Sequence, residues 1–291
     1  MLITQSASKF LKRKSTLNLG GELIDLSSPI VMGILNVTPD SFYNGSLIKD
    51  ENELLKRAEK MLDDGATILD IGAISTRPGS DIISTKEELE RLLPSVIAIR
   101  KNFPDAHISI DTFRSWVAVR VMDEIGPVIV NDISGGQLDS KMFETIGKLK
   151  VPYILTHMKG TPQNMQEDPQ YDDVIKDISA YLSDKVRKLT KAEVNDVIID
   201  PGFGFGKEIA HNYELVNRLD SFKVFQLPVM VGVSRKSMVW KILNVDPEKA
   251  LNGTTVINTL ALMGGADILR VHDVKEAMDV ISIFHAIKLT L

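Results

Sequence analysis

The amino-acid sequence predicts an α/β protein of the (β/α)₈ TIM-barrel class. Eight short apolar runs, most of them rich in Val and Ile, recur along the 291 residues. Amphipathic segments with helical periodicity separate most of these runs, a pattern typical of parallel strands covered by helices. Eight strands close such a barrel, and about 250 residues is its usual size.

The chain ahead of the first run has a different pattern. Residues 16–26 read TLNLGGELIDL, with apolar and polar residues alternating on both sides of Gly20-Gly21. Glycines accept the positive φ angles of a tight turn, so we expect a β-hairpin over about 16–27. We expect it to cover the barrel bottom, with the barrel over about 29–291. Because no linker or composition break is visible, one domain over 1–291 is predicted.

The strands and helices follow from the order of these patterns. Residues 51–64 place their apolar side chains on one face and stop at Gly65. Residues 84–101 open with a cap and an acidic first turn, and Pro94 is expected to kink or split that helix. Two more helices are expected over 171–193 and 246–263. The eight strands are expected in PIVMGILN, ATILDIG, HISIDT, PVIVNDI, PYILTH, DVIIDPG, PVMVGVSRK and ADILRVH.

Composition excludes several classes of function. The formal net charge of −5 argues against general nucleic-acid binding, which needs a basic face. The chain has no cysteine, so disulfides, thiolate catalysis and cysteine metal sites are excluded. No apolar run reaches the roughly 20 residues of a membrane span, and no signal-peptide pattern follows the N-terminus. We therefore expect a cytoplasmic protein without a membrane partner.

Each apolar run leads into polar side chains that can bind ligands. In a TIM barrel the C-terminal strand ends surround one mouth, so these side chains are expected to converge. One polar residue at a strand end is as often structural, but convergence from eight strands predicts an active site. In chain order these residues are Asn36, Thr76 and Arg77, Asp111, Asn131 and Asp132, His157, Asp200, Ser234 to Lys236, Arg270 and His272.

Three of these side chains predict the kind of ligand. Asp111, Asn131 and Asp200 would point from three strands into an apolar interior, where a carboxylate is costly unless it is paired. A flat heterocycle with adjacent N–H donors would pair with them, because a carboxylate accepts two parallel N–H bonds. The alternative is that the acids form interior salt bridges with Lys236 and Arg270.

The basic side chains predict an anionic group on the same ligand. Arg270 and His272 stand two apart and share one face of a strand, and this end of such barrels often binds phosphate. The alternative for Arg235 and Lys236 is an exposed charge pair, and Lys236 also allows a Schiff-base role. We expect His157 to be a packed, hydrogen-bonded residue.

The stretch DPGFGFGK at 200–207 looks like a phosphate loop, but its spacing does not match one. A P-loop needs G-x-x-x-x-G-K-[ST], whereas Pro201 stands five residues before Gly206 and Glu208 follows the lysine. A dinucleotide fingerprint needs G-x-G-x-x-G, and this stretch reads G-x-G-x-G. We expect the glycines to turn the backbone around a flat ligand, with Phe203 packed either against that ligand or in the core.

Several motifs together resemble the dihydropteroate synthase family. They are GILNVTPDSF, STRPG, NDIS, HMKGTP, DPGFGFGK, VGVSRKSM and RVHDVKE, and the match runs from about Ile30 to the last strand. The resemblance implies a homodimeric TIM-barrel transferase of folate biosynthesis. It would join p-aminobenzoate to 6-hydroxymethyl-7,8-dihydropterin diphosphate, giving 7,8-dihydropteroate and pyrophosphate. It also implies Mg²⁺ as cofactor, sulfonamides as inhibitors, and loops at 36–46 and 75–80 that fold over the substrates.

The resemblance also implies roles for individual residues. The implied catalytic residues are Asp111, Lys236, Arg270 and His272. The implied pterin-binding residues are Asp111, Asn131, Asp200 and Lys236. The implied diphosphate-binding residues are Asn36, Arg77, Arg270 and His272, with Asn36 also the metal ligand. The implied p-aminobenzoate-binding residues are Thr76, Arg77, Pro78, Phe203, Ser234 and Arg235.

The chain departs from the family pattern at two places. Ala73-Ile74 stands where the family usually has Gly-Glu, and Phe113-Arg114 follows the third-strand DT. We expect these changes to alter loop packing rather than the chemistry, and to bear on sulfonamide sensitivity. Two other functions fit the same barrel: a pterin-binding methyltransferase, which needs no diphosphate grip, and a pterin-binding relative without turnover.

Overall fold

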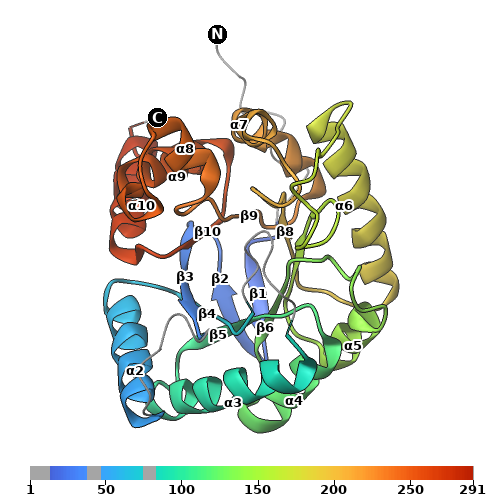
Figure 1. Ribbon diagram of the computed structural model, residues 1–291, viewed down its shortest axis with the longest axis vertical. Helices are drawn as coiled ribbons and strands as arrows, with labels where there is room; N and C mark the ends of the chain where they lie inside the picture. Colours follow the sequence, from blue (N-terminus) through green and yellow to red (C-terminus); the bar gives the residue numbers. More distant parts are fainter. Residues whose placement is uncertain (1–13, 38–46, 75–82, 291) are drawn as a thin grey trace.

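Eight parallel strands form a ring with helices around it (Figure 1). The structure, a computed structural model, describes residues 14–37, 47–74 and 83–290. Neighbouring strands follow the order β8-β7-β6-β5-β4-β3-β10-β9, and a parallel bridge between Ile199 and Val229 links the two outer strands. The predicted TIM barrel is therefore confirmed. Its strands are β3 (Ile30–Asn36), β4 (Ile68–Gly72), β5 (His107–Asp111), β6 (Ile129–Asp132), β7 (Tyr153–Thr156), β8 (Val197–Asp200), β9 (Met230–Val231) and β10 (Ile268–Val271).

The helices follow the strands in alternation, as the periodicity predicts. They are α2 (Leu47–Asp63), α3 (Thr85–Asn102), α4 (Ser115–Ile125), α5 (Met142–Leu149), α6 (Val174–Lys191), α7 (Ile209–Asn217), α8 (Ser237–Leu243), α9 (Leu251–Gly264) and α10 (Val274–Lys288), with short 3₁₀ helices η1 (Leu219–Phe225) and η2 (Pro247–Lys249). Where one helix was expected over 246–263, the structure has η2 followed by α9. Among the described residues no helix has the length and apolar character needed to cross a bilayer.

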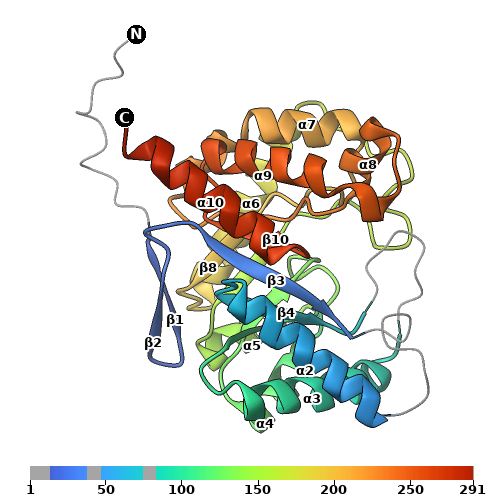
Figure 2. The ribbon, with the colours of Figure 1, turned by 90° about the vertical axis from the view of Figure 1, so that its left-hand side faces the viewer.

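The N-terminal hairpin covers the bottom of the barrel, as predicted. Strands β1 (Thr16–Leu19) and β2 (Glu22–Asp25) pair antiparallel, and both turn glycines have positive φ, 64° and 102°. Figure 2 shows the hairpin below the start of β3. Leu17, Ile24 and Leu26 belong to the same buried cluster as the lowest inward side chains of the barrel. We propose on this ground that hairpin and barrel form one domain.

Two apolar layers result from the alternation of side chains along each strand. The inner layer fills the lower barrel with Met32, Ile68, Ile129, Ile154, Ile198, Met230 and Ile268. The outer layer lies between the strands and the helices, and is the larger of the two. We call this inner layer the floor of the barrel. Polar side chains lie above it, at the C-terminal ends of the strands.

Pro94 was expected to kink or split its helix, and the split does not occur. Helix α3 is 18 residues long and continues on both sides of Pro94. At its N-terminus the Ser84 hydroxyl caps the helix by accepting a hydrogen bond from the amide of Glu87. Pro94 lies on the exposed side of the helix. A proline there frees a carbonyl that water can satisfy, which weakens the helix without ending it.

Candidate active site

The strand ends bring polar side chains together above the isoleucine floor. Side chains two residues apart on a strand face the same side. Asp70, Asn131, Thr156, Asp200 and Arg270 each stand two positions after an inward residue of the floor, so all five point into the barrel. Asp111 joins them, because it pairs in register with Asn131. The predicted convergence at one mouth is therefore found for these strands.

Asp132, beside Asn131 on β6, points the opposite way. Its carboxylate accepts hydrogen bonds from the Ser134 hydroxyl, the Tyr153 hydroxyl and the Gly136 amide, at 2.7 to 2.9 Å. It is fully buried in the layer outside the barrel. We assign it a structural role, which separates it from the inward acids.

One arginine holds two of the inward acids. Arg270 donates from Nε to Asp70 at 2.6 Å and from Nη2 to Asp111 at 2.8 Å. Asp70 also accepts from the Ser109 hydroxyl at 2.6 Å and from the Asn131 amide at 3.0 Å. The interior salt bridge that the sequence left open as an alternative is thus present for Asp111. Arg270 also pairs with Asp70, a residue that the sequence analysis did not select.

Sharing one guanidinium between two carboxylates affects protonation. Burial raises the pKa of Asp111 from 3.8 to about 7; Arg270 opposes this rise, and the neighbouring Asp70 adds to it. Burial without full pairing favours the neutral carboxyl. Asp111 is therefore poised to lose a proton near neutral pH when a ligand supplies new donors or charge.

Two oxygens inside the mouth have no hydrogen-bond partner among the described residues. They are Oδ1 of Asn131 and Oγ1 of Thr156, both shielded from water. An unpaired buried polar atom costs about 1–3 kcal/mol. Because Asn131 gives its amide N–H to Asp70, its free carbonyl is available for a donor on a ligand. This fits the predicted heterocycle rich in N–H groups.

On the far side of the mouth, Asp200 lies near Lys236 and the glycine-rich stretch. Asp200 accepts from the Gly202 amide at 2.7 Å, and burial raises its pKa against the opposing charge of Lys236. Burial lowers the pKa of Lys236 to about 8, and Asp200 limits that fall. The Lys236 ammonium donates to the Phe203 carbonyl and lies 4.5 Å from the centre of the Phe205 ring.

The two phenylalanines of the glycine-rich stretch have different surroundings. Phe203 is fully buried in the outer apolar layer, which is the core position that the sequence left open. Its carbonyl, not its ring, contacts the site. Phe205 is partly exposed and packs beside Ile74, Phe113 and Ile133. An aromatic side chain at the mouth is thus supplied by Phe205, which sequence reasoning did not select.

The residues that follow β9 and β10 are tied to one another. Nδ1 of His272 lies 3.0 Å from the Ser234 hydroxyl. Burial, with a smaller contribution from Arg270, lowers the pKa of His272 to about 4, so the ring is neutral at pH 7. Arg235 donates to both carboxylate oxygens of Asp273, at 2.9 and 2.6 Å. His272 was expected as a cation; in the free protein it acts as a neutral hydrogen-bonding group.

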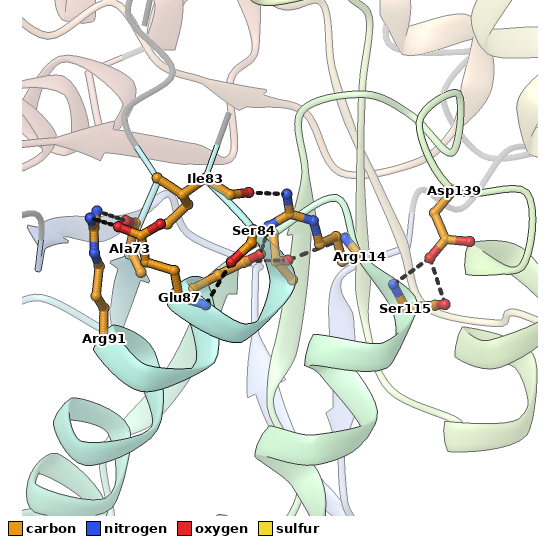
Figure 3. A network of polar contacts seen from close by, with 10 residues as sticks. Ala73, Ile83, Ser84, Glu87, Arg91, Arg114, Ser115 and Asp139 are labelled. Carbon is orange, nitrogen blue, oxygen red and sulfur yellow. Dashed lines mark hydrogen bonds and ion pairs between the residues drawn. The ribbon is translucent and has the colours of Figure 1, made fainter. Parts of the chain in front are cut away.

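Three predicted residues, Thr76, Arg77 and Pro78, lie outside the described residues, as do most of the predicted loops at 36–46 and 75–80. The chain on either side of 75–82 is held by arginines (Figure 3). Arg91 donates to the Ala73 carbonyl and Arg114 to the Ile83 carbonyl. Arg114 also pairs with Glu88, which is fully buried.

Both departures from the family pattern take part in this packing. Ile74 and Phe113 form a small cluster with Ile133, and the guanidinium of Arg114 lies 4.9 Å from the Phe113 ring centre. The expected effect of these departures on loop packing stays a prediction.

The family model described as "Pterin binding enzyme" matches residues 32–272. The dihydropteroate synthase of Escherichia coli K12 is 42% identical over 268 residues, covering 91% of this chain and 94% of that protein. The dihydropteroate synthase of Haemophilus influenzae is 40% identical, with coverages of 90% and 95%.

The chain belongs to the dihydropteroate synthase family.

Solved structures of the family agree with this assignment. The Yersinia pestis dihydropteroate synthase in complex with a sulfonamide drug has a TM-score of 0.87 and 42% identity, covering 94% of this chain and 99% of that chain. The Xanthomonas albilineans dihydropteroate synthase with 4-aminobenzoic acid has a TM-score of 0.87 and 32% identity, with coverages of 94% and 98%. The chain is thus a transferase of folate biosynthesis. The methyltransferase alternative is not favoured, since these relatives are synthases over nearly their full length.

Proposed function

We propose that this chain joins p-aminobenzoate to 6-hydroxymethyl-7,8-dihydropterin diphosphate, and that the inward residues described above carry out the reaction. The main support is the unpaired carbonyl of Asn131, which lies beside two inward carboxylates at the mouth of the barrel. A pterin ring has adjacent ring and amino N–H groups on one edge. Those donors match carboxylate and amide oxygens that otherwise lack enough partners.

Four side chains are proposed to bind the pterin. Asp200 would accept the paired N–H groups, because its charge is stabilised by Lys236 and by the Gly202 amide. Asn131 would accept a further N–H through its free carbonyl. Lys236, which already donates to a backbone carbonyl, has further N–H donors for pterin acceptors. Asp111 would lie next to the charge that develops on the ring.

The diphosphate is proposed to bind near Arg270 and His272. Arg270 keeps its charge at all relevant pH values, and two of its N–H groups are taken by Asp70 and Asp111. Its other N–H groups are the proposed phosphate donors. His272 is neutral in the free protein, and an adjacent diphosphate would raise its pKa. Asn36 and Arg77 complete the proposed set, Arg77 being outside the described residues.

Mg²⁺ is proposed to bind at this end of the site between the protein and the substrate diphosphate, with few ligands from the protein. The described residues contain no cluster of three or more His, Asp or Glu side chains arranged to hold a metal. Mg²⁺ often takes one or two protein oxygens and completes its shell with phosphates and water. Asn36 and Asp111 flank Gly72 with their side-chain oxygens, so Asn36 is the proposed ligand. When bound, the ion would neutralise charge on the leaving diphosphate.

The p-aminobenzoate end is proposed to include Ser234 and the partly exposed Phe205. Thr76, Arg77, Pro78, Phe203 and Arg235 were predicted for the same end. Phe203 would contribute through its backbone, because its ring lies in the core. For Arg235 the bidentate pair with Asp273 holds the guanidinium in place. Its role toward p-aminobenzoate stays a prediction.

In the proposed reaction, the bond between the pterin methylene carbon and the diphosphate oxygen breaks, and pyrophosphate leaves with both electrons. The positive charge left behind spreads over the ring, where the carboxylates of Asp111 and Asp200 stabilise it. The neutral amine of p-aminobenzoate then forms the new carbon–nitrogen bond and loses one proton. An aromatic amine is nucleophilic without prior deprotonation, so no strong general base is required.

Pyrophosphate release tests the proposal. The purified chain, incubated with dihydropterin diphosphate, p-aminobenzoate and Mg²⁺, should release pyrophosphate and form dihydropteroate in equal amounts. Omission of p-aminobenzoate should abolish release. Binding of the pterin without turnover would support the non-catalytic alternative, and a borohydride-trapped adduct at Lys236 would support a Schiff-base enzyme.

A homodimer is also proposed, through helices α9 and α10. Apolar residues at Val256, Leu260 and Met263 of α9 are 43–69% exposed, and Ile283 and Ile287 of α10 are 62% and 54% exposed. The two helices pack side by side, so these side chains can form one apolar face (Figure 2). Large exposed apolar patches commonly mark interfaces.

Sedimentation of the wild-type chain should give the mass of two copies, and Leu260→Glu with Met263→Glu should give one. A wild-type monomer at micromolar concentration would contradict the dimer. Location in the cytoplasm and the lack of nucleic-acid partners stay predictions from composition.

A further inference from the structure

The glycine-rich stretch ends in Lys207, whose side chain points inward rather than to solvent. Only 3% of this residue is exposed. Its Nζ lies 2.8 Å from the Gly202 carbonyl, 3.0 Å from the Phe205 carbonyl and 3.0 Å from Nδ1 of His157. Lysines are almost never fully buried unless they are paired, so this arrangement calls for an explanation.

These three acceptors are the nearest to the Lys207 amine, and the His157 carbonyl lies farther away, at 3.4 Å. Burial lowers the pKa of His157 well below its usual value, so the ring is neutral and Nδ1 can accept a hydrogen bond. Burial also lowers the pKa of Lys207, and the nearby Asp200 opposes that fall. The side chain therefore connects the backbone of the stretch, the end of β7 and the charge of Asp200.

The same stretch supplies two contacts to the proposed pterin residues. The Gly202 amide donates to Asp200 at 2.7 Å, and the Phe203 carbonyl accepts from Lys236. Gly202 has φ of 74°, and a Cβ there would lie 1.9 Å from the His157 carbonyl oxygen. The backbone thus passes against β7 with no free space, and Lys207 fastens it on both sides of Phe203.

We infer that Lys207, seated on His157, is a positioning residue for the pterin substrate. It holds residues 202–205 so that the Gly202 amide orients Asp200 and the Phe203 carbonyl orients Lys236. This inference rests on the proposed function, because it assigns Asp200 and Lys236 to the pterin. It also gives His157 a role, as the acceptor that completes the Lys207 hydrogen bonds.

Other contacts hold the outer side of the same stretch and provide a control. The Tyr171 hydroxyl donates to the Gly206 carbonyl at 2.7 Å, and Asn212 accepts from the Gly204 amide at 2.7 Å. Neither contact involves the carbonyls of Gly202 or Phe205. Tyr171→Phe therefore removes one hydrogen bond from this stretch without releasing the groups that contact Asp200 and Lys236.

The test compares Michaelis constants for the two substrates in Lys207→Met and Tyr171→Phe. Lys207→Met keeps an unbranched side chain, one heavy atom shorter, and removes its donors. We expect its KM for dihydropterin diphosphate to rise on the order of tenfold to a hundredfold, since two binding groups lose their alignment. The KM for p-aminobenzoate, measured at saturating pterin substrate, should rise less than the pterin KM, because Lys207 touches that end only through the Phe205 carbonyl. Tyr171→Phe should leave both constants within about twofold of wild type.

Two variants of His157 test the inference even if Lys207→Met does not fold. Asn at position 157 places an amide oxygen near the position of Nδ1, whereas Leu provides no acceptor. We expect His157→Leu to raise the pterin KM and His157→Asn to restore it. Leu189→Ala, a core change at the end of α6 remote from the mouth, controls for loss of stability alone.

An unchanged pterin KM in Lys207→Met, or equal values in His157→Leu and His157→Asn, would overturn the inference. So would a parallel rise in both Michaelis constants that Leu189→Ala reproduces. Absence of pyrophosphate release by the wild-type chain would instead reject the proposed function itself. The two failures are therefore distinguishable.

Discussion

Replacing Asp111 with asparagine should lower kcat on the order of a hundredfold to a thousandfold, the usual effect of removing one stabilising group from a developing charge. The pterin KM should change by less than about tenfold, because an asparagine oxygen still accepts hydrogen bonds. The reason is the position of Asp111, fully inward, paired with Arg270 and next to the proposed reacting ring. Its negative charge matters most when positive charge develops.

The pH dependence of the same variant provides a second readout. Burial raises the pKa of Asp111 to about 7, so the wild-type kcat/KM should rise with pH toward 7 as the carboxylate forms. Asp111→Asn should lose this rise. The folded protein binds the Asp111 proton more tightly than the unfolded chain does. The free energy of unfolding should therefore fall as the pH rises from about 4 to about 7. That slope should also disappear.

Steady-state kinetics and urea unfolding at several pH values give these results. A variant with normal kcat and a weakened pterin KM would show that Asp111 holds the ligand and does not stabilise charge. A wild-type profile with no change near pH 7 would contradict the proposed protonation.

Replacing Arg270 with methionine should cost about 3–5 kcal/mol in the free energy of unfolding, the usual penalty for leaving a buried ion unpaired. Arg270 is the shared partner of Asp70 and Asp111, and Asp70 is fully buried. Without it, two carboxylates face each other and one of them must take up a proton. Activity should also fall by more than about a thousandfold, since the diphosphate loses its permanent cation.

Urea unfolding at pH 7 measures the stability change. The double variant Arg270→Met, Asp70→Asn should recover part of the lost stability, because only one buried acid then remains. Arg235→Met, which breaks a more exposed pair with Asp273, should cost no more than about 1 kcal/mol. Equal effects of the two arginine changes would mean that the buried cluster does not depend on its charge pairing.

Most of the fold could be predicted from patterns that depend on burial and period. The eight apolar runs are strands because both faces of each are covered, and Gly20-Gly21 forms a turn because it needs positive φ. The fate of Pro94 could not be predicted, because it depends on which side of α3 faces solvent. That side is set by packing against the barrel, not by local sequence.

Part of the candidate site could also be predicted, because residues at strand ends follow directly from the predicted strands. The selection of residues at strand ends included the inward residues Asp111, Asn131, Asp200 and Arg270. It missed Asp70, which lies in the middle of β4. Counting in steps of two from Ile68 would have found it, since inward residues alternate.

The neutral state of His272 and the inward turn of Lys207 had no signal in the sequence. Both depend on burial by distant parts of the chain, which the sequence alone does not reveal.

Pterin binding by two aspartate variants tests the central claim most directly. Asp200 and Asp132 are both buried acids at strand ends, but Asp200 points into the mouth and Asp132 points away from it. In calorimetric titration with 6-hydroxymethyl-7,8-dihydropterin, Asp200→Asn should raise the Kd on the order of tenfold to a hundredfold, whereas folded Asp132→Asn should stay within about twofold of wild type. Equal affinity in Asp200→Asn and wild type would contradict the placement of the pterin at this mouth.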